Sequence, residues 1–178
     1  MKSILISIQP QFVEKILNGE KTIEIRKTKP SCELPCKVYI YQTKKSFVYK
    51  ILKWLGLYKG KVVAEFTLDA VEEFYVFDNG SVQGWNWFGL NRSCLTYEQI
   101  SEYIGLDKKG YAWHIDDLVV YDKPKELSEF YTLKKCNSCA SGYESSGCRY
   151  DEDCKIPVQV TRPPQSYMFV EELGEDYE

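Results

Sequence analysis

The apolar residues of this chain fall mainly into short runs rich in β-branched and aromatic side chains, a pattern typical of β-strands. These runs predict six strands, over residues 4–9, 22–27, 37–43, 61–68, 111–121 and 166–171. Apolar residues at helical spacing are less frequent. The pattern therefore predicts an α+β fold in which strands dominate.

Two short segments carry helical spacing instead. In residues 10–18 the apolar side chains lie on one side, Pro10 suits a first helical turn, and Gly19 follows the last apolar residue. In residues 96–104 a capping threonine, Thr96, is followed three positions later by an amide. We expect two or three short helices in all.

Residues 44–59 are a third helical candidate, in which apolar residues recur at helical spacing and lysines lie outside that stripe. One interpretation is a helix packed on the domain with solvated lysines. Another is a surface that faces nucleic acid, where Trp54 or Tyr58 stacks on a base. Attachment to a membrane surface is a third, weaker interpretation.

The length of 178 residues, with 15% aromatic content, suits one domain with a sizeable core. No linker, repeat or low-complexity segment divides the chain. We therefore predict a single domain over residues 1–178 with two insertions, at about 44–59 and at about 132–160.

The charge and the apolar runs limit the class of protein. A net charge of −3 argues against coating nucleic acid by bulk attraction, so affinity for it must come from a local pocket or patch. The first residues contain too short an apolar run for an export signal, and no run approaches the roughly 20 residues that span a bilayer. We expect a cytoplasmic protein with no membrane partner.

The junction after the first helix carries the most informative chemistry. Gly19 is followed by Lys21 and by a strand of period two, which places Thr22, Glu24 and Arg26 on one face. The opposite face carries Ile23 and Ile25, and we expect it to be buried in the core. The polar face either points to water with one ion pair or lines a cavity together with Lys21.

Residues 4–26, with a helix, a turn and the motif Gly-x-Lys-x-x-Glu-x-Arg in that order, resemble the ASCH domain family of the PUA-like superfamily. Residues 60–66 and 110–115 resemble later strands of the family, and residues 162–170 resemble the closing segment of its phage-associated members. The resemblance implies a PUA-like mixed β-barrel with two or three short helices and a cysteine-rich insertion.

The resemblance also implies binding of RNA or a nucleotide-like ligand in a cleft beside this motif. Lys21 and Arg26 would meet phosphate or a base carbonyl, and Glu24 would accept from an exocyclic amine. Replacing Glu24 or Arg26 by alanine is then expected to abolish binding with little loss of folding.

Hydrolysis is an alternative, with Lys21 and Glu24 as the candidate catalytic residues. A ribonuclease would use Glu24 or His114 as base beside Lys21 and Arg26. ASCH-like amidohydrolases that deacetylate acetylcytidine pair the lysine with a threonine at the position of Glu24, and they have a glutamate where residues 91–94 have none. A rearranged amidohydrolase would have to use Thr22, which offers a hydroxyl next to Lys21.

Four further residues are candidates for ligand binding. Glu65 lies on the polar side of an otherwise apolar strand and either lines the cleft or pairs with Arg26 or Lys21. The only histidine, His114, either is a hydrogen-bonded structural residue or faces the cleft. Trp85 and Trp87 supply aromatic planes for a base pocket or for a satellite core.

The second insertion carries the four cysteines Cys136, Cys139, Cys148 and Cys154. The Cys-x-x-Cys pair followed by two more thiols could hold one structural zinc ion, although the second gap of five residues is irregular for a zinc ribbon. The alternatives are a disordered loop with free thiols, or a redox role for Cys136 and Cys139. A third functional class, a phage or host protein-interaction module, would use this loop and the basic helix.

Overall fold

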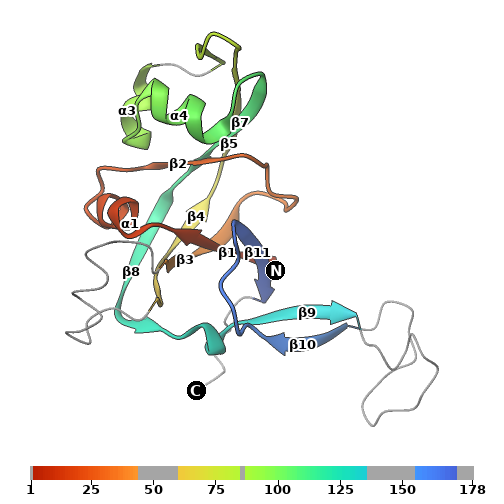
Figure 1. The fold of residues 1–178 in the computed structure, drawn as a ribbon. Coiled ribbons are helices and arrows are strands. Elements are labelled where there is room, and N and C mark those ends of the chain that lie inside the picture. Colours follow the sequence, from red (N-terminus) through yellow and green to blue (C-terminus); the bar gives the residue numbers. More distant parts are fainter. Residues whose placement is uncertain (1, 44–59, 85–86, 136–154, 172–178) are drawn as a thin grey trace.

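Strands carry most of the fold in the computed structural model, which describes residues 2–43, 60–84, 87–135 and 155–171 (Figure 1). A five-stranded sheet has the order β11-β1-β3-β4-β8. Its strands are β11 (Tyr167–Glu171), β1 (Lys2–Ile8), β3 (Cys36–Gln42), β4 (Val62–Leu68) and β8 (Asp116–Lys125). Strands β1 and β3 are parallel, and the other pairs are antiparallel.

A four-stranded sheet has the order β2-β7-β5-β6. Its strands are β2 (Ile23–Arg26), β7 (Lys108–His114), β5 (Val71–Val76) and β6 (Val82–Gln83), all antiparallel. The chain passes directly from β4 to β5 and from β7 to β8, so two continuous stretches join the large sheets. Among the described residues the strand pairings form open sheets, and the predicted closed barrel is not seen in them.

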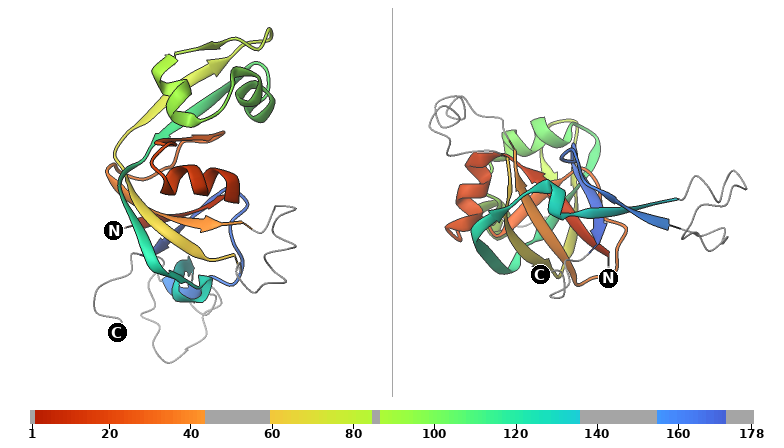
Figure 2. Two further views of the ribbon diagram at one scale, coloured as in Figure 1. Left: turned by 90° about the vertical axis from the view of Figure 1, so that its left-hand side faces the viewer. Right: turned by 90° about the horizontal axis from the view of Figure 1, so that it is seen from below.

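The β9 strand (Tyr131–Lys135) and the β10 strand (Lys155–Gln159) form a separate antiparallel ribbon. Figure 2 shows this ribbon projecting from the body of the molecule. It corresponds to the two ends of the predicted insertion at 132–160. The cysteines between the two strands lie outside the described residues.

The helices in the described part of the chain are α1 (Pro10–Leu17), α3 (Trp87–Ser93), α4 (Tyr97–Ile104) and the short 3₁₀ turn η1 (Leu127–Glu129). Both helices predicted around residues 10–18 and 96–104 are confirmed. Helix α4 begins at a capping box in which Thr96 and Gln99 satisfy each other's backbone N–H groups. The basic helix predicted at 44–59 lies outside the described residues. Of the described helices, none has the length and apolar character needed to cross a membrane.

Five of the six predicted strands are present, with ends within two residues of the prediction. The run 111–121 is wrong as a single strand, because the chain leaves one sheet at His114 and enters the other at Asp116. Asp117 adopts a positive φ of 44° just after this break. The apolar run continues through the break although its two halves differ: β7 buries Ala112 and Trp113, whereas Val119 and Val120 of β8 are about half exposed.

Three apolar clusters hold these layers together. Helix α1 packs Val13 and Ile16 against the five-stranded sheet, and α4 packs Ile100 and Ile104 against the four-stranded sheet. A third cluster around Tyr39 and Phe130 covers the other side of the five-stranded sheet. Burying one such apolar side chain contributes roughly 1.5–3 kcal/mol, so the clusters fix α1 on the five-stranded sheet and α4 on the sheet that contains β2.

Candidate ligand-binding site

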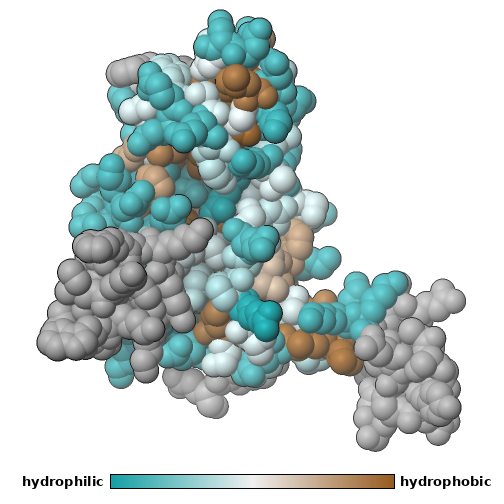
Figure 3. Space-filling view, in the orientation of Figure 1, coloured by the Kyte–Doolittle hydropathy of each residue, from teal (hydrophilic) through white to brown (hydrophobic). Residues whose placement is uncertain are grey.

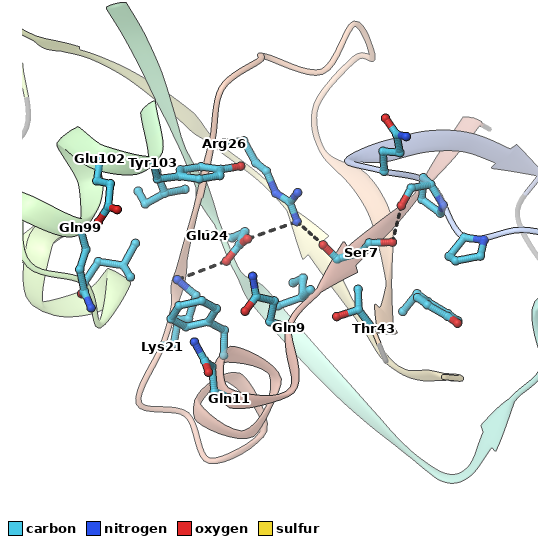
Figure 4. Close-up of a pocket in the computed structure, with 18 residues that line it drawn as sticks. Ser7, Gln9, Gln11, Lys21, Glu24, Arg26, Thr43, Gln99, Glu102 and Tyr103 are labelled. Atoms are coloured by element: carbon cyan, nitrogen blue, oxygen red, sulfur yellow. Dashed lines mark hydrogen bonds and ion pairs between the residues drawn. The ribbon is translucent and has the colours of Figure 1, made fainter. Parts of the chain in front are cut away.

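A cavity of about 1080 Å³ opens between α1 and α4, with β2 as its floor (Figure 4). Helix α4 supplies one wall and the β1–α1 segment supplies another. The residues that line it are Ser7, Ile8, Gln9, Gln11, Phe12, Lys21, Glu24, Ile25, Arg26, Tyr41, Thr43, Leu95, Gln99, Glu102, Tyr103, Pro163, Pro164 and Gln165. Figure 3 shows that the surface around this opening is mostly hydrophilic.

The carboxylate of Glu24 lies at the centre of the floor, between two cations. Lys21 Nζ is 3.2 Å from Glu24 Oε2, and Arg26 Nη2 is 3.2 Å from Glu24 Oε1. All three residues are buried, with exposures of 1% for Lys21, 8% for Glu24 and 5% for Arg26. The three predicted residues therefore form one buried ion triad, and the polar face of β2 does not point to bulk water.

The Lys21 ammonium is fully engaged by protein groups. Besides Glu24, it donates to the Ile23 carbonyl at 2.7 Å and to the Ser93 carbonyl at 2.8 Å, and it lies 5.4 Å from the centroid of the Phe12 ring. Three acceptors use the three N–H bonds of an ammonium. In this arrangement Lys21 has no free N–H for a phosphate and no lone pair with which to act as a base.

The end of α3 holds the Lys21 segment in place. Besides the Ser93 carbonyl, the Arg92 carbonyl accepts from the Thr22 backbone N–H at 2.9 Å. The Arg92 guanidinium donates from Nε to the Thr22 hydroxyl at 2.8 Å. Thr22 therefore faces α3 and does not line the cavity.

Arg26 connects β2 to β1. Its Nη2 donates to the Ser7 carbonyl at 2.8 Å while it pairs with Glu24, and the Ser7 hydroxyl donates in turn to the Pro164 carbonyl at 2.7 Å. The buried Nε of Arg26 has no hydrogen-bond partner among the described residues. A buried unsatisfied donor is costly, and this one belongs to a side chain that lines the cavity.

The walls above the triad combine amide and aromatic side chains. Gln9 and Gln11 face Gln99 and Glu102 across the opening, and Tyr103 lies beside Arg26 (Figure 4). Burial raises the pKa of the Tyr103 phenol above its ordinary value, with nearby Arg26 opposing the rise, so the phenol stays protonated near neutral pH. Among the described lining residues, two cations and two carboxylates give a net charge of zero.

The structure places two other predicted site residues outside this cavity. Glu65 accepts from the Tyr121 hydroxyl and lies 3.4 Å from Lys37 Nζ, so the interpretation that it pairs with Arg26 or Lys21 is wrong. Burial, followed by this hydrogen bond, raises the pKa of Tyr121. His114 Nε2 lies 3.0 Å from Glu72 Oε1 on the neighbouring strand. Neither Glu65 nor His114 lines the cavity.

The remaining predicted site residues lie in segments whose side chains the structure does not describe. Trp85 lies outside the described residues, and Trp87 begins α3 but its side chain is not among the described ones. The four cysteines of the predicted zinc site also lie outside them, so zinc stays a prediction. Within the described residues, no group of three histidine, cysteine or carboxylate side chains could hold a metal ion.

The sequence did not identify the cavity-lining side chains of α4. Gln99, Glu102 and Tyr103 are separated from the motif by more than seventy residues and carry no motif of their own. The amphipathic pattern of residues 96–104 predicts a polar face on this helix, but it does not predict which residues that face contacts.

The fold and this site define a class of protein, a mixed α+β domain with the ASCH fold. The chain is similar to the ASCH protein from Zymomonas mobilis, with 21% identity, a TM-score of 0.59, and coverage of 96% of this chain and 89% of that one. A tyrosine-to-phenylalanine variant of that protein matches at 20% identity with a TM-score of 0.55, covering 97% and 92% of the two chains. A serine-to-alanine variant matches at 19% identity with a TM-score of 0.53, covering 96% and 89%.

These similarities establish the fold, because the identities are too low to carry an activity. They confirm the predicted resemblance to ASCH domains at the level of the fold. The finer resemblance to phage-associated members stays a prediction. No protein-family model matches the sequence, and no curated protein matches it.

Proposed function

We propose that this protein binds RNA or a nucleotide-like ligand, with a base inserted into the cavity between α1 and α4. The observation that carries the proposal is a polar, partly aromatic cavity built over a carboxylate that two buried cations hold in place. The ASCH fold of the chain is consistent with such a module.

Glu24 is suited to read the edge of a base. A carboxylate has about four acceptor sites, and Lys21 and Arg26 occupy one on each oxygen. The remaining sites can accept from an exocyclic amine. Because the two cations fix the carboxylate before a ligand arrives, little conformational entropy is lost on binding.

The walls offer the two other contacts that a base requires. The amides of Gln9, Gln11 and Gln99 each provide both donors and acceptors, as base edges do. Tyr103 lines the cavity and is 40% exposed, and the Lys27 ammonium lies 5.1 Å from the centroid of its ring. A base can stack on the face of the ring that Lys27 leaves open. Such stacking contributes about 1–3 kcal/mol per base.

The hydrolase alternatives receive less support from the geometry. Lys21 has three acceptors around its ammonium, which does not suit a general base, and the Thr22 hydroxyl is engaged by Arg92 outside the cavity. His114 is likewise outside it. The segments that a phage or host interaction module would use lie beyond the described residues.

The experiment compares two tyrosines of the same helix. Tyr103 lines the cavity, whereas Tyr97 is similarly exposed on α4 and does not line it. The four ribonucleosides, their 5′-monophosphates and short RNAs are titrated calorimetrically into the wild-type protein, Tyr103→Ala and Tyr97→Ala. Each mixture is then chromatographed, so that the same samples report any turnover.

We expect saturable binding of at least one probe, weakened about 5- to 150-fold by Tyr103→Ala, as the loss of one stacking contact implies, and unchanged by Tyr97→Ala. Absence of binding across the panel would overturn the proposal. Equal weakening by both variants would also overturn it, because the cavity would not then be the site. Turnover of a probe would favour the hydrolase alternative instead.

A further inference from the structure

Two cysteines outside the cavity lie unusually close together. Cys32 belongs to the segment between β2 and β3, and Cys36 is the first residue of β3. Their Sγ atoms are 3.0 Å apart, and both residues are free cysteines. At this separation the sulfurs need to approach by only about 1 Å to reach the length of a disulfide bond.

The two thiols differ in their surroundings. Cys36 is buried, with 8% exposure, in the apolar cluster of the five-stranded sheet, whereas Cys32 packs against that cluster and is partly exposed. Burial, followed by the hydrogen bond to Cys32, raises the pKa of the Cys36 thiol to about 12. Cys36 therefore keeps its proton at neutral pH, and the more exposed Cys32 is the sulfur that an oxidant in solution reaches first.

We propose that Cys32 and Cys36 form an oxidisable dithiol that a hydroperoxide converts into an intramolecular disulfide. The Cys32 thiol releases its proton and the thiolate attacks the peroxide. The O–O bond breaks, Cys32 becomes a sulfenic acid, and the alkoxide, or hydroxide from hydrogen peroxide, takes up that proton and leaves as an alcohol or water. The Cys36 sulfur then attacks the Cys32 sulfur. The S–S bond forms, the S–O bond breaks, and water leaves with the proton of Cys36.

Cys94 provides a contrast within the same chain. Its Sγ contacts the Glu20 carbonyl at 3.5 Å and is also partly exposed. No other sulfur is close to it among the described residues. Peroxide can oxidise Cys94 to a sulfenic acid, but this residue has no neighbouring thiol there to complete a disulfide.

The sequence offers a direct readout of this reaction. Tryptic cleavage after Lys27 and Lys37 releases the peptide 28–37, because the bond from Lys29 to Pro30 resists trypsin. This peptide contains Cys32 and Cys36 and no other cysteine. The tryptic peptide 93–108 contains Cys94 alone and serves as the internal control.

The folded, full-length protein is treated with hydrogen peroxide, acidified, unfolded, alkylated and digested for mass spectrometry. We expect the peptide 28–37 to lose two hydrogen atoms and to carry no alkyl group, while the peptide 93–108 forms no intrapeptide product. Closure of the disulfide from oxidised Cys32 should be at least about tenfold faster in the folded protein than in urea, since this step is intramolecular and the fold holds the two sulfurs 3.0 Å apart. In Cys36→Ser, Cys32 should be trapped by a sulfenic-acid reagent instead.

Several results would overturn the proposal. They are alkylation of both cysteines after peroxide treatment, a rate that does not change in urea, and cross-linking of Cys32 or Cys36 to a different cysteine. Protection from alkylation with a gain of oxygen, instead of the loss of two hydrogens, would also overturn it, because it would indicate sulfinic or sulfonic acids in place of a disulfide. Thermal unfolding of Cys36→Ser verifies that this variant is folded.

Discussion

At the scale of single residues, the burial of Glu24 adds a structural role to the ligand-binding role expected from the sequence. From the sequence, alanine at this position was expected to abolish binding at little cost in folding. The structure instead places the carboxylate between Lys21 and Arg26, which are 1% and 5% exposed. Removing the negative charge leaves two buried cations without a counter-ion, so the triad is part of the fold as well as of the site.

We therefore predict that Glu24→Gln lowers the free energy of unfolding by about 3–5 kcal/mol, the usual cost of removing one partner of a buried ion pair. Urea unfolding followed by circular dichroism measures this change. The matched control is Glu73→Gln, because Glu73 forms an ion pair with Lys109 at 2.6 Å on the exposed surface. An unfolding free energy equal to that of the control would show that the triad does not stabilise the fold.

The sequence could predict which residues form the triad but not its geometry. Period-two alternation placed Glu24 and Arg26 on one face of a strand, and Gly19, with φ of +75°, ends α1 as predicted. The burial of that face depends on α3 and α4, which return to β2 from about seventy residues later. Local periodicity carries no information about such a distant contact, so Glu102 and Tyr103 remained undetected.

At the scale of elements, the pairing of β5 with β7 depends on a glycine. Gly110 lies opposite Phe74 in the register of these strands, and the buried Phe74 ring covers the space where a side chain would be. A Cβ added at Gly110 would lie 2.3 Å from Phe74 Cζ and 2.5 Å from Phe74 Cε2. Real Cβ atoms do not approach other atoms so closely, so the ring would have to move within a packed core.

We predict that Gly110→Ala lowers the free energy of unfolding by about 1–3 kcal/mol through overpacking. Phe74→Leu should recover part of this loss, so that the double variant is more stable than the sum of the single changes implies. Gly19→Ala is the control, because nothing lies within 4 Å of a Cβ there and its cost is only left-handed backbone strain. Strict additivity of Gly110→Ala with Phe74→Leu would contradict the proposed clash.

The elements themselves were largely predictable, since each strand carries its own β-branched or aromatic run and α4 its own capping box. The strands β5, β6, β9 and β10 were missed. Strand β5 has adjacent glutamates at Glu72 and Glu73, and the β9–β10 ribbon is mostly exposed and has lysines at the ends of both strands. The pairing of β9 with β10 involves no buried face, and in β5 only Phe74 and Val76 are buried, so the apolar pattern of each strand is weak.

At the scale of the whole molecule, the cavity brings together segments that are far apart in the chain. It is lined by residues 7–9, 11 and 12, the triad, Tyr41 and Thr43, the α4 wall and residues 163–165. The protein carries a net charge of −3, and the charges of the described lining residues cancel. Neither the global field nor the cavity therefore attracts phosphate strongly, and recognition is expected to depend on the base.

This balance predicts that a nucleoside and its 5′-monophosphate bind with similar affinity, and that neither affinity depends strongly on salt. Each phosphate that a protein neutralises in a single strand contributes a slope of about −0.7 to the dependence of log K on log salt concentration. Calorimetric titrations of both probes at several salt concentrations measure that slope. It should be near zero because Lys21 has no free N–H and the charge of Arg26 is already paired with Glu24. Much tighter binding of the monophosphate, with a slope near −0.7, would instead identify a phosphate site in the cavity. A slope that appears only with longer RNA would indicate phosphate contacts outside the cavity, and the lysines of residues 44–59 are the first candidates for substitution.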